Sequence, residues 1–283
     1  MYVSEMPRAE GVEHTFPVVD GLRVHCAVAG EGPPLVLLHG WPQHWWSWRE
    51  LIGPLAESYR VICPDIRGMG WTDAPRDGYH LRTLTRDLLR LLDVLGLDRV
   101  RLIGHDWGFL IGYSACFTAP ERVERFVPMG GVTPWSAMGA PPLLYLRPWH
   151  ISLLASPIGP RLVHAVARNR LHAWRKTGRF SEEETEIYMA PLRRPLGAQA
   201  TLGRDRQIVR RDIPWFIRHA PRLRLRVPTL HLNGELDPLT QGVPDSYRRF
   251  ADDMQLELVP NCGHFIAEER PQWLLDRLES FLR

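Results

Sequence analysis

The chain has 283 residues, enough for one large α/β domain or two small ones, and its 45% hydrophobic content is ordinary for a globular protein in water. A formal net charge of +3 is too small to favour nucleic acid as a partner. Four cysteines without a CxxC pair give no sign of a zinc or redox site, and neither a signal peptide nor a membrane-spanning run is recognisable, so we expect a cytoplasmic protein.

Apolar runs and helical patterns alternate through the first half of the chain. Short apolar runs bounded by turn residues indicate strands, and leucines at helical spacing before Gly96 indicate a helix. The predicted elements are strands at 35–38, 60–63, 100–103 and 123–129, and helices at 81–95 and 108–118. This alternation predicts a mostly parallel sheet that helices cover on both faces.

The alternation stops after Gly131. Residues 133–218 are rich in proline, arginine and tryptophan, and they indicate several helices without strands. The helical segments include 143–154, 181–189 and 200–211.

Strand signals return in the last quarter of the chain. They lie at 229–232 and 256–259, and an amphipathic helix is predicted at 271–282. An α/β pattern that stops and then resumes indicates a helical insertion into one core. The predicted division is a core of residues 1–133 and 219–283 and an insertion of residues 134–218.

A glycine-flanked aspartate follows the strand at 100–103. The sequence Gly104-His105-Asp106-Trp107-Gly108 fits a sharp strand-to-helix turn of the form glycine, x, nucleophile, x, glycine. Such a turn exposes the middle side chain at the carboxyl edge of the sheet, and the start of the next helix favours an anion there. Read alone, the pattern is equally open to a simpler interpretation, in which Asp106 only caps that helix.

Three further segments follow strands at the same predicted edge. Asp237 comes after the strand at 229–232, and His264 comes after the strand at 256–259. The order nucleophile, acid, histidine is that of the hydrolase triads built on this kind of turn. His39-Gly40-Trp41-Pro42 follows the strand at 35–38, where such a fold takes an amide for its oxyanion hole. These features favour a catalytic role for Asp106.

These motifs, together with PDIRGMGWTDAP at 64–75, resemble those of the α/β-hydrolases, and within them the epoxide hydrolases and haloalkane dehalogenases that use an aspartate nucleophile. The resemblance covers about residues 20–133 and 220–283. It implies an α/β-hydrolase fold, with a mostly parallel sheet of the eight-stranded type, flanking helices and an inserted helical cap domain. The tryptophan in His-Gly-Trp-Pro leans toward the epoxide hydrolases.

The resemblance also implies roles for the residues at the sheet edge. A carboxylate displaces leaving groups from saturated carbon and so forms an alkyl ester on the enzyme. Glu235 is a rival acid, but Asp237 matches the last position of the family's G-x-x-D. The implied assignment is Asp106 as nucleophile, His264 as water activator, Asp237 as its acid partner, and the amides of Trp41 and Trp107 as oxyanion hole.

The cap departs from the family pattern. Opening an epoxide leaves an alkoxide that needs an acid, and epoxide hydrolases of this branch usually supply two cap tyrosines. Local patterns place His150 and Asp205 at those positions. Tyr145 and Tyr188 lie at other positions in the cap and are alternative acids; the simpler interpretation is that both side chains only pack. Trp149 is a candidate hydrogen-bond donor to a halide.

We therefore expect an enzyme, a hydrolase that turns an epoxide into a vicinal diol. A haloalkane or haloacid dehalogenase is the alternative, and a non-catalytic small-molecule binding protein on the same fold is the lesser one. The expected partner is a small apolar electrophilic substrate, without nucleic acid or membrane, bound to a monomer or homodimer. No metal or other cofactor is expected.

Overall fold

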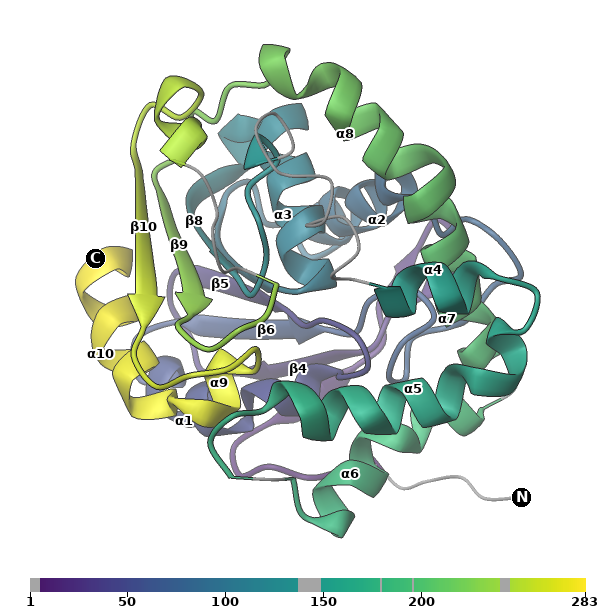
Figure 1. Cartoon of the computed structure of the whole chain (residues 1–283). Helices are drawn as coiled ribbons and strands as arrows, with labels where there is room; N and C mark the ends of the chain where they lie inside the picture. Colours follow the sequence, from purple (N-terminus) through teal and green to yellow (C-terminus); the bar gives the residue numbers. More distant parts are fainter. Residues whose placement is uncertain (1–5, 137–148, 179, 195, 240–244) are drawn as a thin grey trace.

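The computed structural model describes residues 6–136, 149–178, 180–194, 196–239 and 245–283. Its main feature is an eight-stranded sheet in the order β1-β4-β6-β5-β7-β8-β9-β10 (Figure 1). The pairs β1–β4 and β4–β6 are antiparallel, and the others are parallel. The strands are β1 (Glu13–Thr15), β4 (Cys26–Ala29), β5 (Pro34–Leu38), β6 (Arg60–Pro64), β7 (Val100–His105), β8 (Val123–Met129), β9 (Thr229–Gly234) and β10 (Met254–Val259).

The six parallel strands confirm the predicted mostly parallel sheet. Each predicted strand is found, and β7, β9 and β10 extend two residues beyond the expected bounds. Sequence reasoning missed β1 and β4 at one edge, and also the hairpin of β2 (Val18–Val19) and β3 (Leu22–Arg23). These strands are two to four residues long, too short for a hydrophobic period to emerge.

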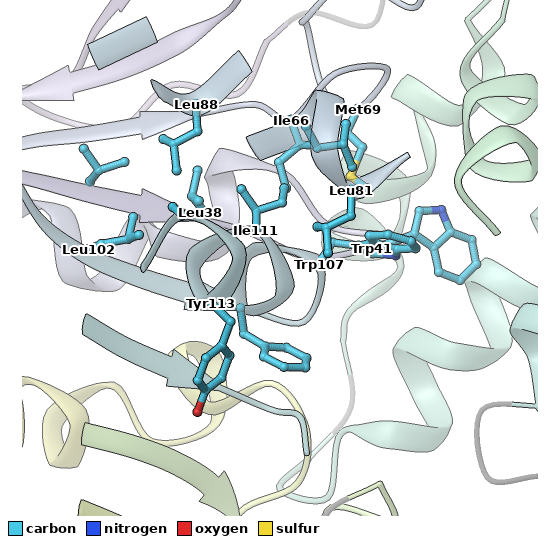
Figure 2. Packing of buried hydrophobic residues seen from close by; sticks show 14 of the residues in the cluster. Leu38, Trp41, Ile66, Met69, Leu81, Leu88, Leu102, Trp107, Ile111 and Tyr113 are labelled. Atoms are coloured by element: carbon cyan, nitrogen blue, oxygen red, sulfur yellow. The ribbon is translucent and has the colours of Figure 1, made fainter. Parts of the chain in front are cut away.

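Helices cover both faces of the sheet because its parallel strands are apolar on both sides. Along β5, Leu35 and Leu37 join one buried cluster, whereas Val36 and Leu38 join the other. Figure 2 shows Leu38, Leu102 and Ile111 within the second cluster. The first cluster includes α1 (Arg49–Ala56) and α10 (Pro271–Leu282), and the second includes α2 (Leu81–Val94) and α3 (Trp107–Thr118).

Within its described residues the predicted insertion contains helices joined by turns and loops, without a strand. Its helices are α4 (Trp149–Ala155), α5 (Gly159–Trp174), α6 (Glu182–Met189), α7 (Gly197–Gln207) and α8 (Ile213–His219), with a π-helical turn at Ile208–Asp212. Segments 181–189 and 200–211 therefore match closely, and part of 143–154 lies outside the described residues. Buried residues of α5 and α7 continue the α2–α3 cluster, so the insertion packs directly on the core.

Two observations concern the cysteines and the possibility of a membrane-spanning helix. Cys26, Cys63, Cys116 and Cys262 are all buried and free. Within the described ranges, every helix is too short or too polar to cross a lipid bilayer.

Candidate active site

Asp106 lies on a strained turn between β7 and α3. Its φ is 53° and its ψ is −111°, a backbone conformation that a residue with a side chain rarely adopts. A Cβ atom on Gly104 or Gly108 would collide with backbone carbonyl groups, so both flanking glycines are required by close packing. Asp106 occupies the N-cap position of α3, but its side chain makes no capping hydrogen bond. The simpler capping interpretation therefore loses its support.

The loop after β5 contacts one oxygen of this carboxylate. The backbone N of Trp41 donates to Asp106 Oδ1 over 2.8 Å. A Cβ on Gly40 would overlap the Asp106 side chain, so only glycine admits this approach. The Trp107 amide follows Asp106 directly at the start of α3. The Trp41 amide therefore contacts the Asp106 carboxylate directly, and the oxyanion-hole roles of Trp41 and Trp107 stay predictions.

The other oxygen faces the histidine. His264 Nε2 is 3.4 Å from Asp106 Oδ2, and His264 Nδ1 is 2.8 Å from Asp237 Oδ2. Burial disfavours the charged imidazole, but the charge of Asp237 and the hydrogen bonds to both aspartates outweigh burial and raise the pKa of His264. Glu235 is exposed and accepts from the backbone N of Asn261. The geometry therefore favours Asp237 over Glu235 as the partner acid.

Hydrogen bonds hold the loop that contains His264 against the end of α5. The backbone N of His264 donates to the carbonyl of Trp174 over 3.1 Å. The buried Glu269 carboxylate accepts from the backbone N of Gly263 at 3.0 Å, and from those of Lys176 at 2.8 Å and Thr177 at 2.9 Å. These bonds fix His264 relative to α5. Side chains on the face of α5 that points toward this loop are therefore held in a fixed position relative to His264.

That inner face carries Arg170, which sequence reasoning missed. The side chain is buried, and its Nη2 donates to Asp106 Oδ2 over 2.6 Å and lies 3.2 Å from His264 Nε2. Burial alone would raise the pKa of Asp106, but the Arg170 charge and the His264 contacts hold that pKa well below its usual range. Arg170 shares the buried face of α5 with Val163 and Ala167. A charged residue on an apolar helical face was the available signal.

His150 on α4 is the expected cap residue that lies closest to this arrangement. Its Nε2 accepts a hydrogen bond from Arg170 Nη1, and its ring stacks on that of Trp41 with centroids 6.5 Å apart. Burial and the Arg170 charge lower the pKa of His150 to about 2, so the ring is neutral near pH 7. Because Nε2 accepts, the ring proton is on Nδ1. His150 can therefore offer a hydrogen bond, but it holds no extra proton to give.

Asp205 on α7 is the second expected cap residue, and it is buried. It lies one helical turn after Thr201, whose Oγ1 accepts from the indole Nε1 of Trp41 over 3.0 Å. Burial raises the pKa of Asp205 to about 7, although Arg204 and Arg170 oppose that rise. A carboxyl group with this pKa keeps a proton under conditions in which Asp106 is fully ionised.

The other cap predictions lie elsewhere. The Tyr188 hydroxyl donates to Glu268 Oε1 over 2.6 Å and accepts from Arg49, so this hydrogen-bond network between α6 and the core occupies it. The Trp149 side chain is 56% exposed and meets the His150 ring edge-on from outside. Among the described residues, neither side chain contacts Asp106, because Tyr188 is taken up by Glu268 and Arg49 and Trp149 is largely exposed. Tyr145 lies outside the described residues.

Comparison with known proteins gives consistent matches. The sequence pattern of the alpha/beta hydrolase fold matches residues 33–271. The soluble epoxide hydrolase of Corynebacterium sp. is 30% identical over 286 residues, which cover 95% of this chain and 97% of that protein. Human epoxide hydrolase 4 is 28% identical over 282 residues, which cover 93% of this chain and 76% of that protein.

Solved structures agree with the sequence matches. The epoxide hydrolase CorEH, without ligand, superposes with a TM-score of 0.86 at 30% identity, over 96% of this chain and all of that one. Cfl2 from Burkholderia cenocepacia superposes with a TM-score of 0.87 at 27% identity, over 98% of both chains. The resemblance therefore extends over the sheet-containing segments and the helical insertion together.

Proposed function

Because the chain belongs to the alpha/beta hydrolase fold family and is an epoxide-hydrolase-like member of it, we propose that it hydrolyses epoxides to vicinal diols through an ester on Asp106. One observation carries the proposal. The Asp106 carboxylate has one oxygen held by the Trp41 amide, while the other faces His264, which is paired with Asp237. That arrangement suits a carboxylate nucleophile whose ester a neighbouring base then hydrolyses.

In the first step Asp106 Oδ2 attacks an epoxide carbon. A bond forms between Oδ2 and that carbon, and the ring C–O bond breaks to give an alkoxide. The low pKa of Asp106 keeps the nucleophile ionised, and the Trp41 amide leaves Oδ2 as the attacking atom because it occupies Oδ1. The alkoxide then needs a proton from the cap.

In the second step water attacks the Asp106 carbonyl carbon. His264 takes one proton from the water, and Asp237 stabilises the imidazolium that results. The Trp41 amide, joined by that of Trp107, holds the tetrahedral oxyanion. The bond between the Asp106 carbonyl carbon and Oδ2 then breaks, and His264 returns its proton to the departing diol oxygen. The second water proton leaves through Asp106 and replaces the one that the cap gave up.

The proton for the leaving oxygen comes from Asp205 in this proposal. Asp205 takes the position where relatives are expected to have a tyrosine, it is buried, and its pKa is raised to about 7. The neutral His150 ring adds a hydrogen bond from Nδ1. A hydrogen-bond donor and a proton donor together replace two tyrosine hydroxyls.

Isotope labelling tests the covalent step. In a single turnover in H₂¹⁸O with enzyme in excess, we expect an unlabelled diol and one ¹⁸O atom in the peptide that contains Asp106. The reason is that the diol keeps Oδ2, whereas the water oxygen enters the carboxylate. Mass spectrometry of the diol and of the peptide reads both results. Label in the diol from the first turnover would show direct attack by water and would contradict the ester.

The pH dependence of alkylation tests Asp205. The ester-forming rate should be constant below about pH 7 and should fall tenfold per pH unit above it, because only the protonated carboxyl donates. Asp205→Asn should lower this rate by about 10²-fold to 10⁴-fold and remove the alkaline decline. Stopped-flow fluorescence of the nearby tryptophans, followed from pH 5 to pH 9, measures the rate.

Asp212 provides the matched control. Burial also raises its pKa, but its carboxylate accepts from the backbone N of Leu81 over 3.1 Å and serves the packing of the cap on α2. Asp212→Asn should keep the wild-type pH profile. An alkaline decline that persists in Asp205→Asn would assign the proton to another group.

A further inference from the structure

A buried cation, Arg170, contacts the nucleophile, although a neutral epoxide brings no charge with which it could pair. The Arg170 side chain is only 5% exposed. Its guanidinium group lies 4.0 Å from the ring centroid of Trp174 and 5.7 Å from that of Trp41, which together hold it in the site. Its Nε is buried and finds no hydrogen-bond partner in the part of the chain that the structure describes.

We propose that the substrate carries a carboxylate, which Arg170 binds while Asp106 attacks the adjacent epoxide carbon. The substrate class is then the 2,3-epoxy acids, with the apolar remainder of the molecule against the aromatic rings of the cap. This inference rests on the proposed function, because it names the substrate class of the same site.

The charge balance of the reaction supports the proposal. Before reaction, the Asp106 carboxylate neutralises Arg170 at 2.6 Å. Esterification removes the anion that contacts the guanidinium directly, and the negative charge moves to Asp205, which has given up its proton and interacts with Arg170 through its charge alone. Asp237 is committed to His264, and His150 is neutral. A substrate carboxylate supplies an anion in direct contact with Arg170 throughout the lifetime of the ester.

The donor geometry of Arg170 also fits a carboxylate. Nε and Nη2 lie on one edge of the planar guanidinium group, the edge that binds carboxylates through two parallel hydrogen bonds. Nε is unpartnered among the described residues, and Nη2 already contacts Asp106 Oδ2. A carboxylate on this edge therefore lies beside the attacking oxygen. The electrophilic carbon is then one or two bonds from the carboxylate, as it is in a 2,3-epoxy acid.

A second buried arginine adds to the positive field. The Arg204 side chain is fully buried, contacts Thr201 Oγ1 at 3.2 Å and lies 5.7 Å from the ring centroid of Trp107. It forms no ion pair with a carboxylate in the described ranges of the chain, and its Nε is likewise unpartnered there. Burial lowers the pKa of Arg204 to about 10, so it stays charged near pH 7. An anionic substrate gains from this field, whereas a neutral epoxide does not.

A matched pair of substrates tests the proposal. We compare trans-2,3-epoxybutanoate with its primary amide, which has the same shape without the charge. The wild type should favour the acid by about 10-fold to 100-fold in kcat/KM, and Arg170→Met should lose that preference because turnover of the acid falls further than turnover of the amide. Arg168→Met, two positions away on the outer face of α5, removes an exposed arginine that pairs with Glu182 and should keep the preference.

Two results would overturn the proposal and leave the proposed function standing. One is equal turnover of acid and amide by the wild type. The other is an equal loss of both rates in Arg170→Met, which would assign Arg170 to the leaving oxygen or to the placement of Asp106. If the enzyme hydrolysed neither the acid, nor the amide, nor the neutral styrene oxide, the proposed function itself would be overturned. Chloride release from 2-chlorobutanoate but not from its amide would support carboxylate selection with a halogen as leaving group.

A binding measurement is independent of turnover. The unreactive trans-but-2-enoate lacks the epoxide but keeps the carboxylate. It should raise the melting temperature of the wild type and of Arg168→Met, but not that of Arg170→Met, and trans-but-2-enamide should raise none of them. Equal shifts with acid and amide would contradict carboxylate binding by Arg170 even if no epoxide is hydrolysed.

Discussion

Asp106→Asn is expected to lower epoxide turnover by about 10⁶-fold, the size of effect seen when a covalent nucleophile is removed from a hydrolase. The amide keeps the shape of the carboxylate and still accepts from the Trp41 amide, so the turn after β7 is retained. It has no anionic oxygen to displace the epoxide oxygen, and no ester forms. Diol production with enzyme in large excess, measured by mass spectrometry, gives the residual rate.

The matched control for this variant is Asp87→Asn. Asp87 on α2 pairs with Arg67 at 2.6 Å, much as Asp106 pairs with Arg170, and its carboxylate lies outside the proposed site. Its loss should cost some stability and leave kcat within a few-fold of wild type. If Asp106→Asn retained a tenth of the wild-type rate, the carboxylate would not be the nucleophile, and the proposed chemistry would fail.

The sheet and the residues at its carboxyl edge were predictable because the signals are local. Asp106 and Asp237 follow buried strands and His264 follows the edge strand β10, and parallel strands bring their carboxyl ends together whatever the rest of the chain does. The glycines beside Asp106 mark a turn that few other residues allow. The order of strands and turns therefore indicated which loops would meet, and the resemblance to the hydrolases selected Asp237 over Glu235.

The inner surface of the cap was not predictable in the same way. Whether Tyr188 or Arg170 faces Asp106 depends on how α5 and α6 pack on the core, and this packing leaves no local pattern. Tyr188 turns to Glu268, whereas Arg170 turns inward with the apolar face of its helix. His150 and Asp205 were found only through positions inferred from relatives. Their protonation states follow from burial and from Arg170, which the sequence does not reveal.

His264→Gln is expected to trap the ester. Glutamine cannot take a proton from water, so hydrolysis of the ester should slow by about 10⁶-fold. Ester formation continues because Asp106 stays ionised beside Arg170, and the proton for the leaving oxygen comes from the cap rather than from His264. The intact protein should therefore gain the full mass of one epoxide molecule. Peptide mapping should locate that mass on Asp106, and diol release should stop at one equivalent or less.

The double variant Asp106→Asn with His264→Gln separates this trap from non-specific alkylation. It should gain no mass, because four buried cysteines and the exposed nucleophiles remain in both proteins and only the ester-forming oxygen is gone. The rate of ester hydrolysis in Asp237→Asn should lie between the rates of the wild type and of His264→Gln, because a misoriented imidazole slows hydrolysis by about 10⁴-fold without ending it. Slow diol formation by His264→Gln without any adduct would mean that water attacks the epoxide directly. Asp106 would then be a base, and the positive charge of Arg170 beside it would work against that role.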